Sequence, residues 1–133
     1  LLVPVAFLDG LGDISPAPGA IADLLGDDGR LVAFTFDTLA AGTDLHTRVF
    51  EPSAGGERAA SGVGAAGCVQ YLADRDAFDG EESSLRVESG QFCDRPATLE
   101  VALDSGAVSG RALLGLAGSV NLPPDDDDDI IVL

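Results

Sequence analysis

The chain has 133 residues, of which 46% are hydrophobic, so it is long enough and apolar enough to fold as one domain with a core. Its charge is unbalanced: 23 acidic residues against 7 basic ones give a net charge of −16. All the basic residues are arginines. This balance argues against nucleic acid as a partner, because phosphate binding needs a cationic surface.

The acidic excess favours a protein that works at high ionic strength, where salt screens the repulsion between like charges. We therefore expect a cytoplasmic protein of a halophile; an ordinary acidic protein from a compositionally biased genome is the alternative. No apolar stretch reaches membrane-spanning length and no signal peptide is visible, so no membrane partner is expected. Cys68 and Cys93 are not spaced as metal ligands, and we expect free thiols, no metal and no cofactor; a Cys68–Cys93 disulfide is the alternative.

In chain order, the pattern predicts short strands around one long helix. Pro4 in the first strand indicates a sheet edge, and a short helix follows at Pro18–Leu25. Short connections between the later strands favour mostly antiparallel pairing. The expected strands are Leu1–Leu8, Arg30–Asp37, Leu45–Phe50, Leu85–Val87, Ala97–Leu103, Ala107–Ser109 and Ala112–Gly115, with a last one at Ser119–Leu122.

The central helix is expected over residues 61–73, after a glycine-rich loop at Pro52–Glu57. Its sequence is apolar except for Gln70, which predicts burial on nearly all sides. The N–H groups of a first helical turn lack intrahelical partners and carry partial positive charge, which suits a carboxylate or phosphate. We expect residues 1–124 to form a single lobe and residues 125–133 an acidic tail that stays solvated.

The residues at the start of this helix each have a structural and a functional interpretation. Ser61 is a good N-cap, with or without a substrate contact. Gly62 and Gly64 allow either tight packing on the sheet or a ligand close to the backbone. Glu57 interacts with the helix dipole or is a solvated acid, and Arg58 pairs with Glu57 or binds an anion. His46, a lone histidine on a strand, is expected to be structural.

Several segments in matching order resemble the phenazine-biosynthesis-like (PhzF-like) isomerases. The family pattern begins with R-x-F-x-P, continues with E-D-P-x-T-G-S-A and then has a helix that ends in Y-L. A second motif, Q-G-x-x-M-G-R-P-S-x-L, follows downstream. The matching segments here are Thr47–Pro52, Gly56–Glu57, Ala60–Gly62, Ala65–Ala66, Tyr71–Leu72 and Glu88–Leu99. The opening Leu1–Val5 and the Ser15-Pro16 turn also resemble the start of the family's second lobe.

The resemblance implies one lobe of a diaminopimelate-epimerase-like fold: an α+β lobe with a strongly curved, mostly antiparallel sheet around one buried helix. It implies the C-terminal lobe, without the upstream lobe that supplies a catalytic acid–base group. Arg58 replaces an acidic residue of the pattern, and Val63 replaces a hydroxyl residue. On the related racemase pattern E-x-x-A-C-G-x-G, Glu57 is kept and Ser61 replaces the catalytic Cys. The hydroxyl of a serine is a far weaker base than the thiolate of a cysteine.

The leading hypothesis is a cofactor-independent isomerase or epimerase that acts on a small carboxylated metabolite. Glu57 and Ser61 are its expected catalytic residues. The expected substrate-binding residues are Arg58, Gly62, Val63 and Gly64. The alternative is a degenerate binding or structural protein that keeps the fold, which the changes at Arg58 and Val63 favour. Either way we expect an apolar face covered by the missing lobe or by a second copy, as in a homodimer.

Overall fold

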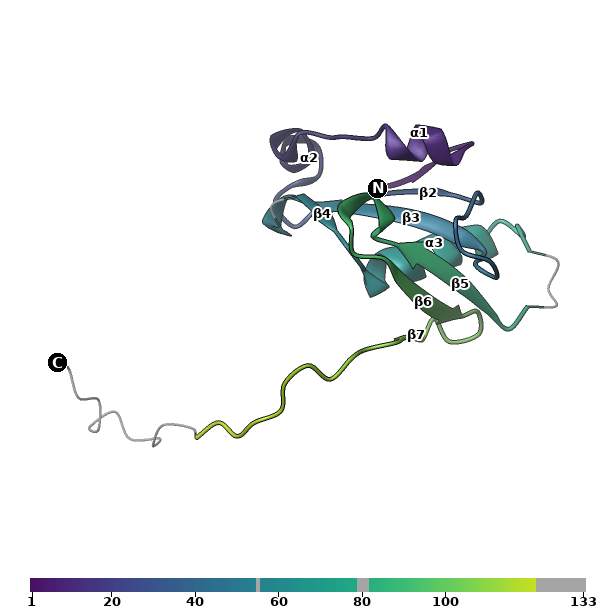
Figure 1. The fold of residues 1–133 in the computed structure, drawn as a ribbon. Coiled ribbons are helices and arrows are strands. Elements are labelled where there is room, and N and C mark those ends of the chain that lie inside the picture. Colours follow the sequence, from purple (N-terminus) through teal and green to yellow (C-terminus); the bar gives the residue numbers. More distant parts are fainter. Residues whose placement is uncertain (55, 79–81, 122–133) are drawn as a thin grey trace.

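The computed structural model describes residues 1–54, 56–78 and 82–121, and these form one seven-stranded mixed sheet with three α-helices (Figure 1). The helices are α1 (Leu8–Gly12), α2 (Pro18–Leu25) and α3 (Gly62–Ala73), with short 3₁₀ turns η1 (Pro52–Ala54) and η2 (Gln91–Cys93). The strands are β1 (Leu2–Pro4), β2 (Leu31–Thr35), β3 (Leu45–Glu51), β4 (Gly56–Arg58), β5 (Ser84–Ser89), β6 (Ala97–Ala102) and β7 (Val108–Gly110).

The strand order in the sheet is β1-β2-β3-β5-β6-β7, and β4 also pairs with β3. The β1–β2 and β3–β5 pairings are parallel, and the other four are antiparallel. β2 occupies one edge of β3, so β4 and β5 share its other edge: β5 beside Leu45–Thr47 and β4 beside Val49–Glu51. The sheet therefore forks along β3, and α3 is the connection between the two branches.

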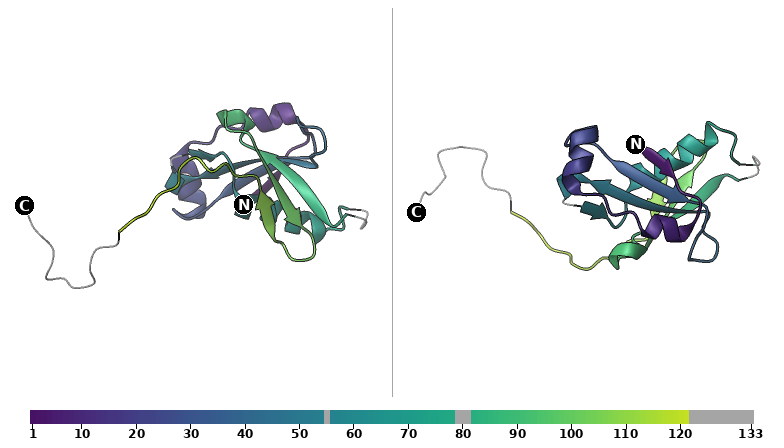
Figure 2. Two further views of the ribbon diagram at one scale, coloured as in Figure 1. Left: turned by 60° about the horizontal axis from the view of Figure 1, so that its bottom comes forward. Right: turned by 90° about the horizontal axis from the view of Figure 1, so that it is seen from above.

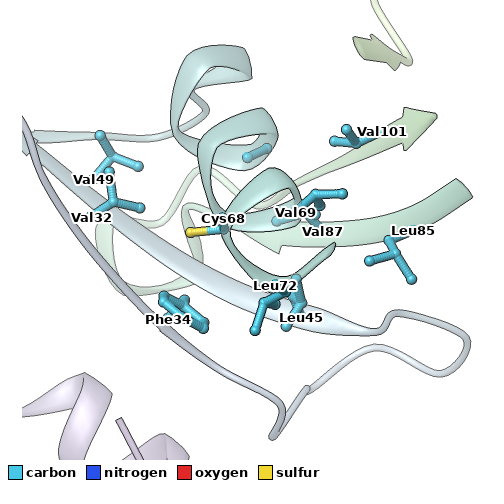
Figure 3. Close-up of a cluster of buried hydrophobic side chains, with 11 residues drawn as sticks. Val32, Phe34, Leu45, Val49, Cys68, Val69, Leu72, Leu85, Val87 and Val101 are labelled. Atoms are coloured by element: carbon cyan, nitrogen blue, oxygen red, sulfur yellow. The ribbon is translucent and has the colours of Figure 1, made fainter. Parts of the chain in front are cut away.

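Helix α3 lies inside the curve of the sheet and supplies the centre of the core. Its buried side chains recur at spacings of three and four, which puts them on one face of the helix. Figure 3 shows Val32, Phe34 and Val49 on one side of the helix and Leu85, Val87 and Val101 on the other, with Leu45 beside Leu72. The predicted α+β lobe with a curved, mostly antiparallel sheet around one helix is confirmed. The expected burial on nearly all sides is wrong, because the buried residues lie on one face and the apolar Val63 is 66% exposed.

Helix α1 is an element that the sequence pattern did not predict. The expected strand Leu1–Leu8 ends at Pro4, and a short helix with two glycines follows. Glycine disfavours helices, so tertiary contacts must hold this one. Leu11 is wholly buried, and Arg48 on β3 donates to the carbonyl oxygens of Leu11, Gly12 and Ile14 at 2.8, 3.0 and 2.8 Å.

The other expected elements divide into confirmed and corrected ones. The helix Pro18–Leu25 and the strands on β2, β3, β5, β6 and β7 are confirmed to within two or three residues. β4 was expected as loop. The strand expected at Ala112–Gly115 is wrong, and residues 119–121 are not a strand either. Leu122 and the acidic run 125–129 lie outside the described residues. After β7, residues 111–121 leave the lobe as an extended segment, as Figures 1 and 2 show from three directions.

Both cysteines are free, as predicted: Cys68 is buried on α3 and Cys93 is half-buried. Burial raises the pKa of the Cys68 thiol to about 12. Within the described ranges, no helix is long and apolar enough to cross a membrane.

Candidate functional site

The start of α3 is capped by Ser61, as the sequence predicts. Ser61 has extended backbone dihedrals, and its Oγ accepts the N–H of Gly64 at 3.1 Å. Its carbonyl oxygen accepts the N–H of Ala65 at 2.9 Å. The cap uses only an oxygen lone pair of the hydroxyl, so the O–H of Ser61 is still available as a donor.

Two N–H groups of this first turn have no acceptor within the described part of the chain, those of Gly62 and Val63. Val63 is 66% exposed, so the turn is open to solvent. A Cβ added at Gly62 would meet only Val108, at an ordinary contact distance of 3.5 Å. Packing within this lobe therefore does not explain the glycine at 62. We call Ser61, Gly62 and Val63 the α3 entrance.

Gly64, in contrast, is a packing residue. A Cβ at this position would lie 2.7 Å from Cγ2 of Val49, closer than carbon atoms approach without a shift. Its N–H is already bound to Ser61. The glycine at 64 thus lets α3 approach β3, and of the three residues of the helix start expected to bind substrate, Gly62, Val63 and Gly64, it is the one whose N–H is already used.

Glu57 lies on β4 in a bidentate ion pair with Arg48. Nε and Nη2 of Arg48 donate to the two carboxylate oxygens at 3.0 and 2.7 Å. The two side chains are only 8% and 12% exposed. The Arg48 guanidinium also stacks against Phe50 and Phe92, 4.9 and 4.8 Å from their ring centroids. Arg48 therefore joins α1, β3, β4 and η2 around Glu57.

The expected pairing of Arg58 with Glu57 is wrong. Successive residues of a strand point to opposite faces, so Arg58 turns away from Glu57. Its Nε instead donates to Glu51 at 2.9 Å, and Arg30 binds the other oxygen of the same carboxylate. The hydrogen bond from Arg30, with that from Arg58, lowers the pKa of Glu51 below its usual 4.5 despite its burial. Arg58 remains 52% exposed along its side chain.

Gly90 holds the turn between β5 and β6 against the segment that enters α3. Its φ of +84° is in the left-handed region, and a Cβ there would lie 2.2 Å from the oxygen of Arg95 and 2.5 Å from that of Ala59. The second motif of the sequence, Glu88–Leu99, is thereby placed beside the α3 entrance. The motif at the start of α3 and the motif Glu88–Leu99 are far apart in the sequence, and the structure brings them together.

A buried His46–Glu88 pair lies on the neighbouring strands β3 and β5. Both side chains are wholly buried, and His46 Nδ1 is 2.9 Å from Glu88 Oε1, although the N–H direction is poor for a hydrogen bond. Burial lowers the pKa of His46 below 6.5, against the opposing effect of Glu88. Glu88 also accepts the backbone N–H groups of Leu39 and Ala40. Glu88 thus holds the loop before β3 in place, and His46 packs against Glu88, which agrees with a structural role for His46.

Comparisons with known proteins identify the fold. No protein-family model and no curated protein sequence matches the chain. Among solved structures, a PhzF-family phenazine biosynthesis protein of Bacillus anthracis matches with a TM-score of 0.63 and 21% identity, over 80% of this chain and 39% of that one. A phenazine biosynthesis PhzC/PhzF protein of Clostridium difficile matches with a TM-score of 0.66 and 15% identity, over 91% of this chain and 44% of that one.

The chain is thus an α+β protein with a PhzF-like fold, the fold that the sequence motifs predicted. It spans less than half the length of the two solved chains that it matches. At these identities the likeness concerns the fold, and activity is a separate question.

Proposed function

We propose that this chain is one lobe of a cofactor-independent, PhzF-like isomerase that acts on a small carboxylated metabolite. The observation that carries the proposal is the open α3 entrance, with unused N–H groups on Gly62 and Val63, in a PhzF-like fold. Two unused N–H groups at a helix N-terminus suit a carboxylate and the negative charge that grows on it when a neighbouring carbon loses a proton.

In this proposal Ser61 and Glu57 are the catalytic candidates of the lobe. The hydroxyl of Ser61 would donate to the substrate while its oxygen keeps the cap bond to Gly64. Glu57 would have to release one of its two contacts with Arg48 before it could take a proton. The group that moves the proton would therefore come from the partner lobe, and Glu57 would position the site through its ion pair with Arg48. Arg58 is exposed beside Glu51, where it would attract an anionic substrate.

A partner lobe also fits the apolar surface that this lobe leaves uncovered. Val63 at the α3 entrance and Val108 on the neighbouring β7 are 66% and 39% exposed. The segment after β7 carries four more large apolar side chains that are 85–99% exposed: Leu113, Leu114, Leu116 and Val120. Exposed apolar side chains that gather at one place, as Val63 and Val108 do at the α3 entrance, favour an interface. We propose that a partner lobe or a second copy covers it, with a homodimer as the simplest assembly.

The second candidate is a binding protein without catalysis. It is favoured by one observation: Glu57 has both oxygens bound by Arg48, and the acidic residue that the pattern places at 58 is an arginine. Such a lobe would bind a carboxylate at the α3 entrance and move no proton.

One experiment separates the two candidates. The full chain, alone and with a co-expressed partner lobe, is incubated in D₂O with small unsaturated carboxylic acids, and loss of the proton next to the carboxylate is followed by ¹H NMR. An isomerase exchanges that proton, and Gly62→Val and Ser61→Ala abolish the exchange. Gly67→Ala is the matched control, because a Cβ at Gly67 meets nothing within 4 Å. Carboxylate binding without exchange, in the chain alone and with a co-expressed partner lobe, supports the binding protein and contradicts the isomerase.

A further inference from the structure

A groove on the outer face of the sheet contains two arginines and reaches Ala60, the residue before the α3 entrance. β5 and β6 turn the side chains of Leu85, Val87 and Val101 inward to α3, so the alternate residues face outward. On that outer side a hollow of about 920 Å³ runs across β5, β6 and the end of β7. Its lining includes Thr43, Arg86, Gln91, Thr98, Ser109 and Arg111. The volume is of the size that holds a small metabolite.

The charge of this groove is opposite to that of the chain as a whole. The chain carries −16, yet Arg86 and Arg111 both line the groove. Within the described ranges neither guanidinium forms an ion pair, whereas Arg30, Arg48 and Arg58 all do. The one carboxylate among the described lining residues is Glu100, and its Oε1 accepts the Ser84 hydroxyl at 2.7 Å.

One wall of the groove is fixed in place by a buried carboxylate. This wall is the loop Ala40–Thr43, which packs beside Arg86 with Gly42. Glu88, wholly buried beneath it, accepts the N–H of Leu39 at 2.5 Å and the N–H of Ala40 at 2.9 Å. A loop held by charge-assisted hydrogen bonds from below gives the groove a preformed side.

The groove offers four donors for an anion: the guanidinium groups of Arg86 and Arg111 and the hydroxyls of Thr98 and Ser109. Gln91 also lines the groove, but its buried Oε1, which has no hydrogen-bond partner in the described part of the chain, is an acceptor and is therefore not a ligand for an oxyanion.

From these observations we propose that the groove binds the oxyanion, carboxylate or phosphate, of a small metabolite, with Arg86 and Arg111 as its principal ligands. Guanidinium groups bind both oxyanions through paired N–H donors, which is why the two chemistries are tested in parallel. The groove is a second site beside the α3 entrance and does not depend on catalysis there.

The test is a titration of the full ¹⁵N-labelled chain with succinate and, separately, with inorganic phosphate at one fixed KCl concentration. We expect saturable shifts of the amides of Gly42, Thr98 and Ser109. Arg86→Gln and Arg111→Gln should each weaken binding about tenfold, the effect of losing a hydrogen bond to a charged group. Arg75→Gln is the matched control: it removes the same charge, but Arg75 stacks on Tyr71, 3.7 Å from its ring centroid and away from the groove.

Each outcome of the titration decides the proposal. A response to succinate alone, or to phosphate alone, supports it and identifies the oxyanion. The proposal is overturned if the shifts do not saturate, or if the two groove variants and the control bind with equal affinity. Either result would mean that the anion is attracted by charge in general and not by this groove. Shifts confined to Gly62 and Val63 also overturn it, and leave the proposed function of the α3 entrance intact.

Discussion

Two glycines of α3 should respond in opposite directions to the same substitution. Alanine favours a helix over glycine by about 0.5–1 kcal/mol. At Gly67 a Cβ meets nothing within 4 Å, so Gly67→Ala should raise the free energy of unfolding by about that amount. At Gly64 the Cβ would lie 2.7 Å from Val49 Cγ2 in a fully buried position. Overpacking of this kind costs about 1–3 kcal/mol.

Because both variants gain the same helix propensity, the difference between them isolates the clash, and Gly64→Ala should be about 1–3 kcal/mol less stable than Gly67→Ala. The chain has no Trp, so urea unfolding is best followed by far-UV circular dichroism at one KCl concentration. The midpoint should move with no change in slope.

A double variant checks the cause. Val49→Ala removes the methyl groups that the new Cβ would meet, so it should cost less in the Gly64→Ala background than alone, by about 0.5–3 kcal/mol. Equal stability of Gly64→Ala and Gly67→Ala would refute the close approach of α3 to β3, and additive effects with Val49→Ala would show that the cost arises elsewhere.

Three further predictions concern charge and thiols. The thermal midpoint should rise between roughly 0.1 M and roughly 2 M KCl as salt screens the net charge of −16, and a midpoint highest in dilute buffer would contradict this. Since the pKa of Glu51 is lowered from 4.5, its ionised form stabilises the fold above pH 4.5, and this stability is lost as the pH falls further. The destabilisation by Arg30→Gln should therefore shrink below pH 4.5. A difference in stability that does not change with pH would count against the ion pair. Iodoacetamide should add one label to the native chain, at Cys93, and two after unfolding, because Cys68 is buried with a pKa of about 12. Two labels on the native chain in the intact mass would be the contrary result.

The sequence was sufficient to predict α3 and most of the sheet, because their signals are local. The Ser61 cap and the apolar positions spaced by three and four are visible in the sequence itself. So are the apolar, β-branched runs that become β2 and β3. The family motifs added the curvature of the sheet, which no local pattern indicates.

The elements that were missed depend on long-range contacts. α1 contains two glycines and is held by Arg48, more than thirty positions away along the chain. β4 has three residues and exists because β3 offers it an edge. The pairing of Glu57 with Arg48, rather than with its neighbour Arg58, follows from the strand alternation of that unforeseen β4. The strand expected at Ala112–Gly115 has no neighbour to pair with among the described residues.

The proposal of a carboxylate site at the α3 entrance is tested most directly by the amide shifts of Gly62 and Val63 during titration with a small carboxylate. We expect saturable shifts at these two residues in the parent chain and in Gly67→Ala. Gly62→Val should abolish them while the amides of β5 and β6 keep their positions, because the new side chain covers the entrance without entering the core. Unchanged binding in Gly62→Val, or no response at Gly62 and Val63, would contradict the account and leave the α3 entrance as an ordinary helix cap.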